Sequence, residues 1–255
     1  MFIKKDTYGV GTGRLRKLRV LSAIIVGCCV LFINTAGVAA NGSVNAESEK
    51  KPEPIAEGEV SAALLAEVGT GRVVYEYNSE EKLPAAGLTR LAALVSVCKG
   101  FDEGRLKPGD AVSVSEKAAG IGGTTAFLKA GEQMDAETML LAAVMINAGD
   151  ATHSLALAAA GSESAAVQEI NACMAGIGVE TNFSEICGAG EKLSASELAK
   201  IGAALTASES YRKFGTKFYE KIEHNTGAGA TELANPNKLV KQYSGCIGVG
   251  TGSST

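Results

Sequence analysis

Serine, lysine, cysteine and histidine are the residues through which this chain could carry out nucleophilic chemistry. Ser96 and Lys99 have the spacing S-x-x-K, which would place an amine one helical turn from a hydroxyl. The Cys98 thiol is a second potential nucleophile, and His153 and His224 could serve as bases. The S-x-x-K pattern is short and common, and neither histidine lies in a recognisable motif. We therefore interpret all of these residues as structural.

The segment Leu83 to Val97, which reads LPAAGLTRLAALVSV, positions Ser96 and leads directly into Cys98 and Lys99. A proline-marked turn leads into apolar residues that recur at helical spacing, so we expect a helix from Leu88 to Gly100. Before this segment, two short apolar runs at Ser61–Glu67 and Arg72–Tyr77 flank the turn VGTG. That arrangement predicts an antiparallel hairpin.

Most of the remaining chain has helical patterns separated by polar turns. The expected helices are Ala136–Ile146, Ala151–Ala160 with Asp150 as its N-cap, Ser164–Gly176 with Ser162 as its N-cap, and a segment from Ser194 that has a capping box with Glu197. Strand-like pieces are expected at Ala111–Ser115 and just before the terminal GVGTGSST. A hairpin, a block of helices and a late strand predict an α/β or α+β fold in which helices pack against an antiparallel sheet.

The composition fits one globular domain with an N-terminal extension. The chain has 255 residues, a net charge of −4 and 20% charged residues, and the mild acidity argues against nucleic-acid binding. Six cysteines occur without any CxxC pair, so a metal site is not expected. We interpret the four cysteines after the N-terminus as small buried hydrophobic residues, with a disulfide as the alternative in an oxidising compartment.

The N-terminus has the form of an export signal. Basic residues crowd positions 1–19, an uncharged apolar run follows, and small residues end it at Ala40. We expect residues 1–40 to be a cleaved signal peptide or an uncleaved membrane anchor, and residues 41–58 to be a linker. Either form places the domain at 59–255 outside the cytoplasmic membrane, with membrane contact only through the uncleaved segment.

Four stretches of the chain resemble the D-alanyl-D-alanine carboxypeptidases, the low-molecular-mass penicillin-binding proteins that trim cell-wall peptides. The stretches are ALLAEVGTGRVVYEYNSEEKLPAAGLTR, VSEKAAGIGGTTAFLKAGEQMDAETMLLAAVMINAGDA, AAGSESAAVQEINACMAGIGVETNF and NPNKLVKQYSGCIGVGTGSST. The resemblance covers the chain from Ser61 to its end. It implies a β-lactamase/transpeptidase-like fold, a peptidoglycan stem peptide as the ligand, and no cofactor.

The resembling family works through the motifs S-x-x-K, S-x-N and K-T-G. By resemblance, the serine nucleophile falls on Gly87 and the lysine base on Arg90. The second motif falls on Asn147 to Gly149, so that its relay hydroxyl is an amide and its substrate-binding amide is absent. The third motif has Gly250 in place of its lysine. No catalytic side chain is intact at these positions.

Thr251 and Gly252 do fit the third motif, and by resemblance they are substrate-binding positions. The resemblance also implies a domain that is truncated at its C-terminus, since nothing follows Thr255 where two further sheet strands and a trailing β domain are expected.

Three functions remain open from the sequence. The first is an exported, catalytically inactive carboxypeptidase homologue that acts at the peptidoglycan by binding a wall peptide or a cell-envelope protein. The second is an active serine-type D-Ala-D-Ala carboxypeptidase that uses Ser96 and Lys99. The third is a truncated product without a function. The missing nucleophile and base favour the first.

Overall fold

The computed structural model describes residues 60–188, 190–227 and 229–252. These residues belong to one compact unit. The expected signal or anchor at 1–40 and the linker at 41–58 lie outside the described residues. Among the helices that are described, none has the length and apolar character needed to cross a membrane.

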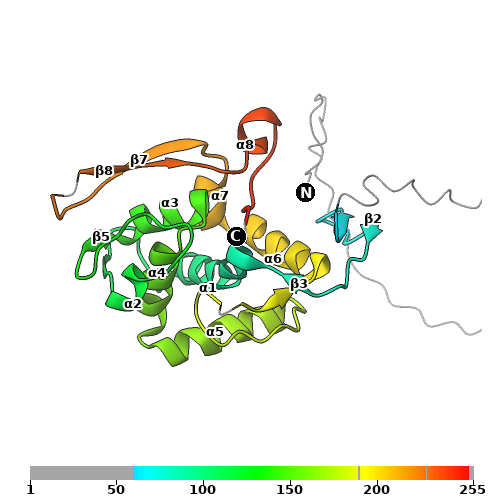
Figure 1. Cartoon of the computed structure of the whole chain (residues 1–255), viewed down its shortest axis with the longest axis horizontal. Helices are drawn as coiled ribbons and strands as arrows, with labels where there is room; N and C mark the ends of the chain where they lie inside the picture. The colour runs from blue at the N-terminus through cyan, green and yellow to red at the C-terminus, as the bar shows by residue number, and fades with distance from the viewer. Residues whose placement is uncertain (1–59, 189, 228, 253–255) are drawn as a thin grey trace, which may run out of the picture. The chain divides into compact units, whose positions relative to one another are not determined.

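A block of helices surrounds one central helix, α1 (Arg90–Asp102), which follows the 3₁₀ turn η1 (Ala86–Thr89). Figure 1 shows α1 among its neighbours, and it contacts α4, α5, α6 and α7. The other helices are α2 (Glu116–Ala119), α3 (Ala136–Ile146), α4 (Gly149–Ala160), α5 (Glu163–Gly176), α6 (Ala195–Ala207), α7 (Glu209–Gly215) and α8 (Leu239–Gln242). Leu91, Leu94 and Val97 of α1 are buried in the common core.

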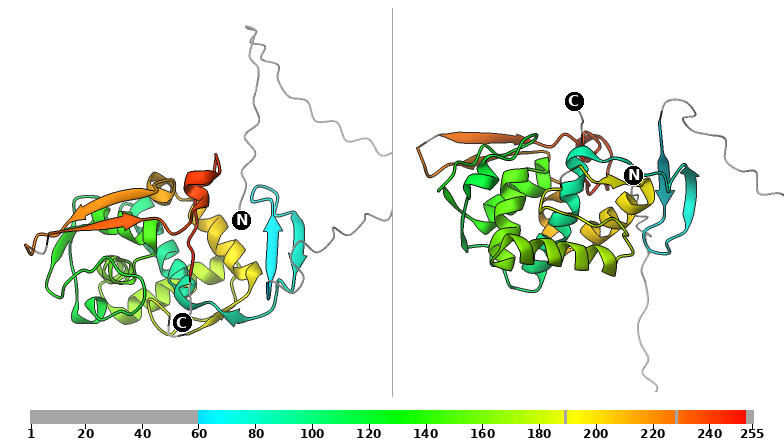
Figure 2. Two further views of the ribbon diagram at one scale, coloured as in Figure 1. Left: turned by 45° about the horizontal axis from the view of Figure 1, so that its top comes forward. Right: turned by 60° about the horizontal axis from the view of Figure 1, so that its bottom comes forward.

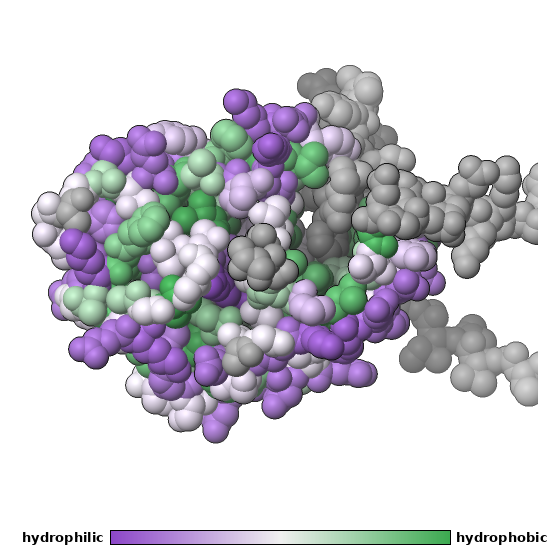
Figure 3. Space-filling model, viewed as in Figure 1, coloured by the Kyte–Doolittle hydropathy of each residue, from purple (hydrophilic) through white to green (hydrophobic). Residues whose placement is uncertain are grey.

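The described strands form four antiparallel pairs. They are β1 (Ala63–Ala66) with β2 (Val73–Tyr77), β3 (Leu83–Pro84) with β6 (Lys192–Leu193), β4 (Ala111–Ser113) with β5 (Gln133–Asp135), and β7 (Tyr219–Glu223) with β8 (Ala230–Ala234). Both views in Figure 2 place the β7–β8 hairpin along the helical block, and β8 contacts α3. In the view of Figure 3, hydrophilic side chains dominate the edge of the block and apolar ones gather nearer its middle. The mixed fold of helices and antiparallel strands is the predicted class.

Several predicted elements are confirmed at nearly the predicted bounds. Helix α3 begins and ends where its apolar spacing indicates, and the hairpin β1–β2 forms around the VGTG turn. Ser162 caps α5 by accepting a hydrogen bond from the Ala165 N–H at 3.2 Å. Ser194 and Glu197 form the expected capping box of α6.

The strand predicted before GVGTGSST is wrong, because residues 246–252 form no strand. Gly248 has φ +119°, which strand residues other than glycine do not adopt, and a Cβ there would lie 2.1 Å from the Tyr211 hydroxyl. The segment is therefore shaped by close packing against α7 instead of by a hydrogen-bonded ladder.

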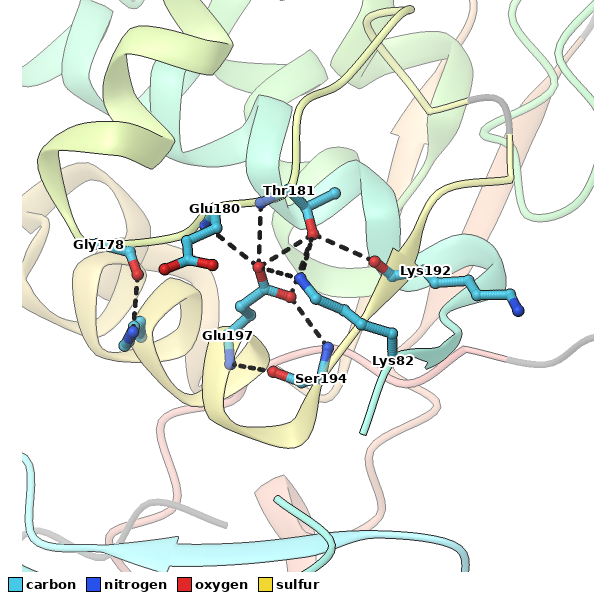
Figure 4. Close-up of polar contacts among 8 residues, drawn as sticks. Lys82, Gly178, Glu180, Thr181, Lys192, Ser194 and Glu197 are labelled. Atoms are coloured by element: carbon cyan, nitrogen blue, oxygen red, sulfur yellow. Dashed lines mark hydrogen bonds and ion pairs between the residues drawn. The ribbon is translucent and has the colours of Figure 1, made fainter. Parts of the chain in front are cut away.

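The Glu197 carboxylate joins three separate segments of the fold (Figure 4). It lies 2.5 Å from the Nζ of Lys82, which precedes β3. It also accepts hydrogen bonds from the backbone N–H groups of Glu180 at 3.2 Å, Thr181 at 3.0 Å and Ser194 at 3.0 Å. Burial alone would raise the pKa of Glu197, but the hydrogen bonds from Lys82, Ser194 and Thr181 outweigh burial and lower it to about 2. The ionised form is therefore the one that the folded chain stabilises.

Glu197→Gln is expected to lower the free energy of unfolding at pH 7 by about 2 kcal/mol, since it removes the charge and one acceptor. A carboxylate with a depressed pKa stabilises the fold above its unfolded pKa of about 4.3, and this stability is lost as pH falls through about 2. The difference from the wild type should therefore shrink between pH 5 and pH 2 in urea titrations. Glu80→Gln, at an exposed glutamate, is the control and should change little. A loss that is independent of pH would contradict the ionic role.

Candidate functional site

The three predicted motif positions lie together at the start of α1. The Asn147 Nδ2 donates a hydrogen bond to the Gly87 carbonyl oxygen at 2.7 Å. The Arg90 Nη1 donates to the Asn147 carbonyl at 3.3 Å. A Cβ built on Gly252 would lie 2.8 Å from the Leu88 Cγ, so the terminal segment crosses the same place. The structure thus brings the three segments into one site.

Gly87 lies in η1 and presents no side chain to this site. A Cβ built there would meet only the Asn147 Nδ2, at 4.0 Å, so the backbone leaves room for a larger residue. The backbone at Gly87 could therefore accommodate the serine that the resemblance predicts at this position.

The Arg90 side chain is buried, with 8% of it exposed, and acts as a backbone clamp. Its Nη1 donates to the Thr124 carbonyl at 2.8 Å as well as to Asn147, and its Nη2 donates to the Gly122 carbonyl. A guanidinium is not deprotonated in proteins, so it cannot act as a general base. What it does is tie the glycine-rich loop at 120–125 to the junction between α3 and α4.

Gly149 and Arg90 fit together as a pair. A Cβ on Gly149 would lie 2.8 Å from the Arg90 Cζ, 3.0 Å from its Nε and 2.7 Å from the Ile121 Cγ2. Real Cβ atoms do not approach other atoms so closely, so the arginine occupies space that a side chain at position 149 would need. Two of the motif replacements are therefore sterically linked.

Asn147 ends α3 in the left-handed conformation, with φ 56°. Asparagine tolerates this conformation better than most residues, because its amide bonds locally. Its Oδ1 is buried and has no hydrogen-bond partner among the described residues. An amide has no titrating proton, so Asn147 supplies no acid–base relay at the position where the resemblance predicts a hydroxyl.

The terminal segment brings Gly250, Thr251 and Gly252 to this site. None of these three residues has a positively charged side chain. A Cβ on Gly250 would lie 3.3 Å from the Leu91 Cδ2, and Thr251 is exposed. Substrate binding by Thr251 and Gly252 stays a prediction.

Ser96 and Lys99 are not arranged as a catalytic pair. Ser96 is 4% exposed within α1, and no described titratable side chain is hydrogen-bonded to its hydroxyl. Lys99 points to the surface, where its Nζ lies 3.8 Å from the Glu103 Oε1. These surroundings support the structural interpretation of the S-x-x-K match.

The cysteines and histidines also lack catalytic geometry. The four described cysteines are free, and of them only Cys98 is fully buried. Burial raises the pKa of Cys98 and of Cys187 to about 12, so both stay protonated thiols near neutral pH. Burial also lowers the pKa of His153, while His224 lies 2.8 Å from the Glu132 Oε1 in a separate network.

Asp150 has a role that differs from the predicted one. The N-cap of α4 is Ala148, and the buried Asp150 carboxylate accepts the N–H groups of Ala126 at 2.9 Å and Leu128 at 3.0 Å. This clamp holds the intervening Phe127, which has φ 60° and is 73% exposed. The prediction of Asp150 as an N-cap is wrong because long-range amides compete for its carboxylate.

Comparison with known proteins gives a consistent result over most of the chain. A family model described as D-alanyl-D-alanine carboxypeptidase matches residues 45–255. The D-alanyl-D-alanine carboxypeptidase DacF of Bacillus subtilis is 31% identical over 238 residues, which cover 92% of this chain and 59% of the relative. The chain therefore spans less than two thirds of that relative's length.

Solved structures support the fold. The D-alanyl-D-alanine carboxypeptidase DacD of Francisella tularensis matches with a TM-score of 0.68 and 18% identity, over 85% of this chain and 65% of that one. Penicillin binding protein 6B of Escherichia coli matches with a TM-score of 0.68 and 23% identity, over 81% of this chain and 66% of that one. These likenesses confirm the predicted β-lactamase/transpeptidase-like fold.

Proposed function

Because the chain belongs to the D-alanyl-D-alanine carboxypeptidase family, we propose that it is an exported homologue that acts at the peptidoglycan without catalysing peptide cleavage. In this proposal it binds a stem peptide of the wall, or a protein of the cell envelope, through the site around Gly87. Residues 1–40 serve as the signal or anchor, 41–58 as the linker and 59–255 as the binding domain.

The state of Arg90 is the observation that carries the proposal. The Arg90 side chain does not extend into solvent. It is buried and donates hydrogen bonds to three backbone carbonyls. The position of the base has thus become part of the scaffold. A serine peptidase needs a group that accepts the proton of its nucleophile, and the described residues in contact with Gly87 and Arg90 offer no such group.

The other replacements act in the same direction. Gly87 supplies no atom to form an acyl bond, and Gly250 supplies no charge for a substrate carboxylate. Loss of the nucleophile alone costs on the order of 10⁶ in rate in serine peptidases. An active enzyme built on Ser96 and Lys99 is disfavoured, because the serine is buried and the lysine faces solvent.

The test is release of D-alanine from an N-acylated peptide that ends in D-Ala-D-Ala. We expect a rate about 10⁶-fold below that of an active carboxypeptidase assayed in parallel, which is no detectable release. Thermal melts with the same peptide should show a saturable rise of Tm, since a ligand that binds the folded state stabilises it. D-alanine release that disappears in Ser96→Ala would overturn the inactive assignment and support the second reading. A melt unaffected by the peptide would argue against wall-peptide binding.

A further inference from the structure

A cavity of about 330 Å³ lies beside the Arg90 guanidinium. It is bounded by the α2 end and the loop after it, by α4, and by the loop at 185–188. The lining side chains include Arg90, Lys117, Ile121, His153, Glu185 and Cys187. The volume is at the lower end of the range for small-molecule sites.

The guanidinium of Arg90 forms no ion pair in the described part of the chain. No carboxylate oxygen there lies within the 4.0 Å of an ion pair, although the side chain is only 8% exposed. A buried charge without a partner is costly, and arginine is rarely buried unless it is paired. Three carbonyl oxygens satisfy hydrogen bonds, but they do not neutralise the charge.

The Arg90 guanidinium has two N–H groups that its hydrogen bonds to carbonyls leave unused. Both bonds from Nη1 and one from Nη2 go to carbonyl oxygens. The Nε–H and the second Nη2–H have no partner in the described residues. The Nε and Nη2 atoms share one edge of the planar guanidinium, and such an edge can take two oxygens of a carboxylate or phosphate side by side.

We propose that this cavity is the binding site of a small oxyanion, a carboxylate or a phosphate, held by the free edge of Arg90. The buried guanidinium without an ion pair provides the attraction, its two unused N–H groups provide the hydrogen bonds, and the cavity provides the space. The family motif has a lysine at position 90, so the site is a property of this chain's own arginine. It does not depend on the proposed loss of catalysis, since a bound anion and an acyl bond involve different groups.

The other charged groups around the cavity are either paired or exposed to solvent. Lys117 adds a second cation on the wall, and its Nζ pairs with the Glu163 Oε2 at 3.1 Å. Glu185 opposes an anion, but it is exposed, so solvent screens it. His153 is neutral near pH 7, since burial lowers its pKa, and its Nε2 lies 2.9 Å from the Glu163 Oε1. Arg90 is therefore the buried charge that decides the sign of the ligand.

The test is a thermal-melt titration of the full chain with sodium phosphate and, separately, sodium acetate, against sodium chloride at equal ionic strength. We expect a saturable rise of Tm with one of the two, and which one responds distinguishes phosphate from carboxylate. Absence of a saturable rise with either salt would overturn the proposal.

Variants locate the site. Arg90→Lys keeps the charge but removes the planar edge, and the apparent Kd should rise at least about tenfold. Arg90 also stabilises the fold through its three hydrogen bonds, so a second variant tests the site independently of Arg90. Lys117→Glu removes the other cation of the cavity wall and should weaken anion binding several-fold. Lys99→Glu is its matched control, since each change reverses one exposed lysine that pairs with a glutamate. Equal weakening by Lys117→Glu and Lys99→Glu, or no weakening in Arg90→Lys and Lys117→Glu, would refute the site.

Discussion

Gly149→Asn, which introduces the amide that the resemblance predicts at this position, is expected to destabilise the protein by about 3 kcal/mol. The new Cβ would lie 2.7 Å from the Ile121 Cγ2 and 2.8 Å from the Arg90 Cζ. Arg90 cannot move aside at little cost, because the carbonyls of Gly122, Thr124 and Asn147 would each lose a donor. Urea unfolding of wild type and variant measures the loss.

A double-mutant cycle separates this clash from a general intolerance of position 149. In the Arg90→Lys background the guanidinium is gone, so adding Gly149→Asn should cost about 1 to 2 kcal/mol less than it does in the wild type. The overlap with Ile121 remains, so relief is partial. Gly109→Asn is the matched control, as its Cβ would meet nothing within 4 Å. Additive losses in the cycle would show that positions 90 and 149 are not coupled.

Local patterns predict much of this fold because each is decided by neighbours in the chain. The apolar spacing of Ala136–Ile146 and the hydroxyl of Ser162 ahead of α5 each act within a few residues. The same holds for the Ser194–Glu197 capping box. In such cases the interactions that decide the local conformation are all between residues close in the sequence, so the predicted element forms.

Residues whose partners lie far along the chain were predicted poorly. The Asp150 carboxylate is taken by amides at 126 and 128, and the hairpin β7–β8 forms from a mixed polar stretch that gives no clear alternation. The identities of Gly87 and Arg90 lead, through the resemblance, to the prediction that the nucleophile and the base are missing. That Arg90 is a buried clamp fitted to Gly149 follows only from the packing of segments almost 60 residues apart.

A serine introduced at Gly87 is expected to fold normally and still fail to react with a penicillin. The site has room for it, since its Cβ would have no neighbour nearer than 4.0 Å. The position expected for the base nevertheless holds a permanently charged arginine, and the neighbouring Asn147 offers an amide that cannot relay a proton. Fluorescent penicillin followed by a denaturing gel should leave Gly87→Ser unlabelled, like the wild type.

Labelling by penicillin is expected only when Arg90→Lys supplies a base that can lose its proton and also removes the guanidinium that overlaps a side chain at position 149. In Gly87→Ser/Arg90→Lys/Gly149→Asn, the lysine can lose its proton and the asparagine no longer meets a guanidinium. A positioned general base contributes 10²–10⁴ in rate, so labelling should be at least about 100-fold faster than in Gly87→Ser. The control is the same variant with Gly87→Ala in place of Gly87→Ser, and it should give no fluorescent band. Rapid labelling of Gly87→Ser alone would mean that the chain holds an unrecognised base, and that the missing nucleophile is its one catalytic defect.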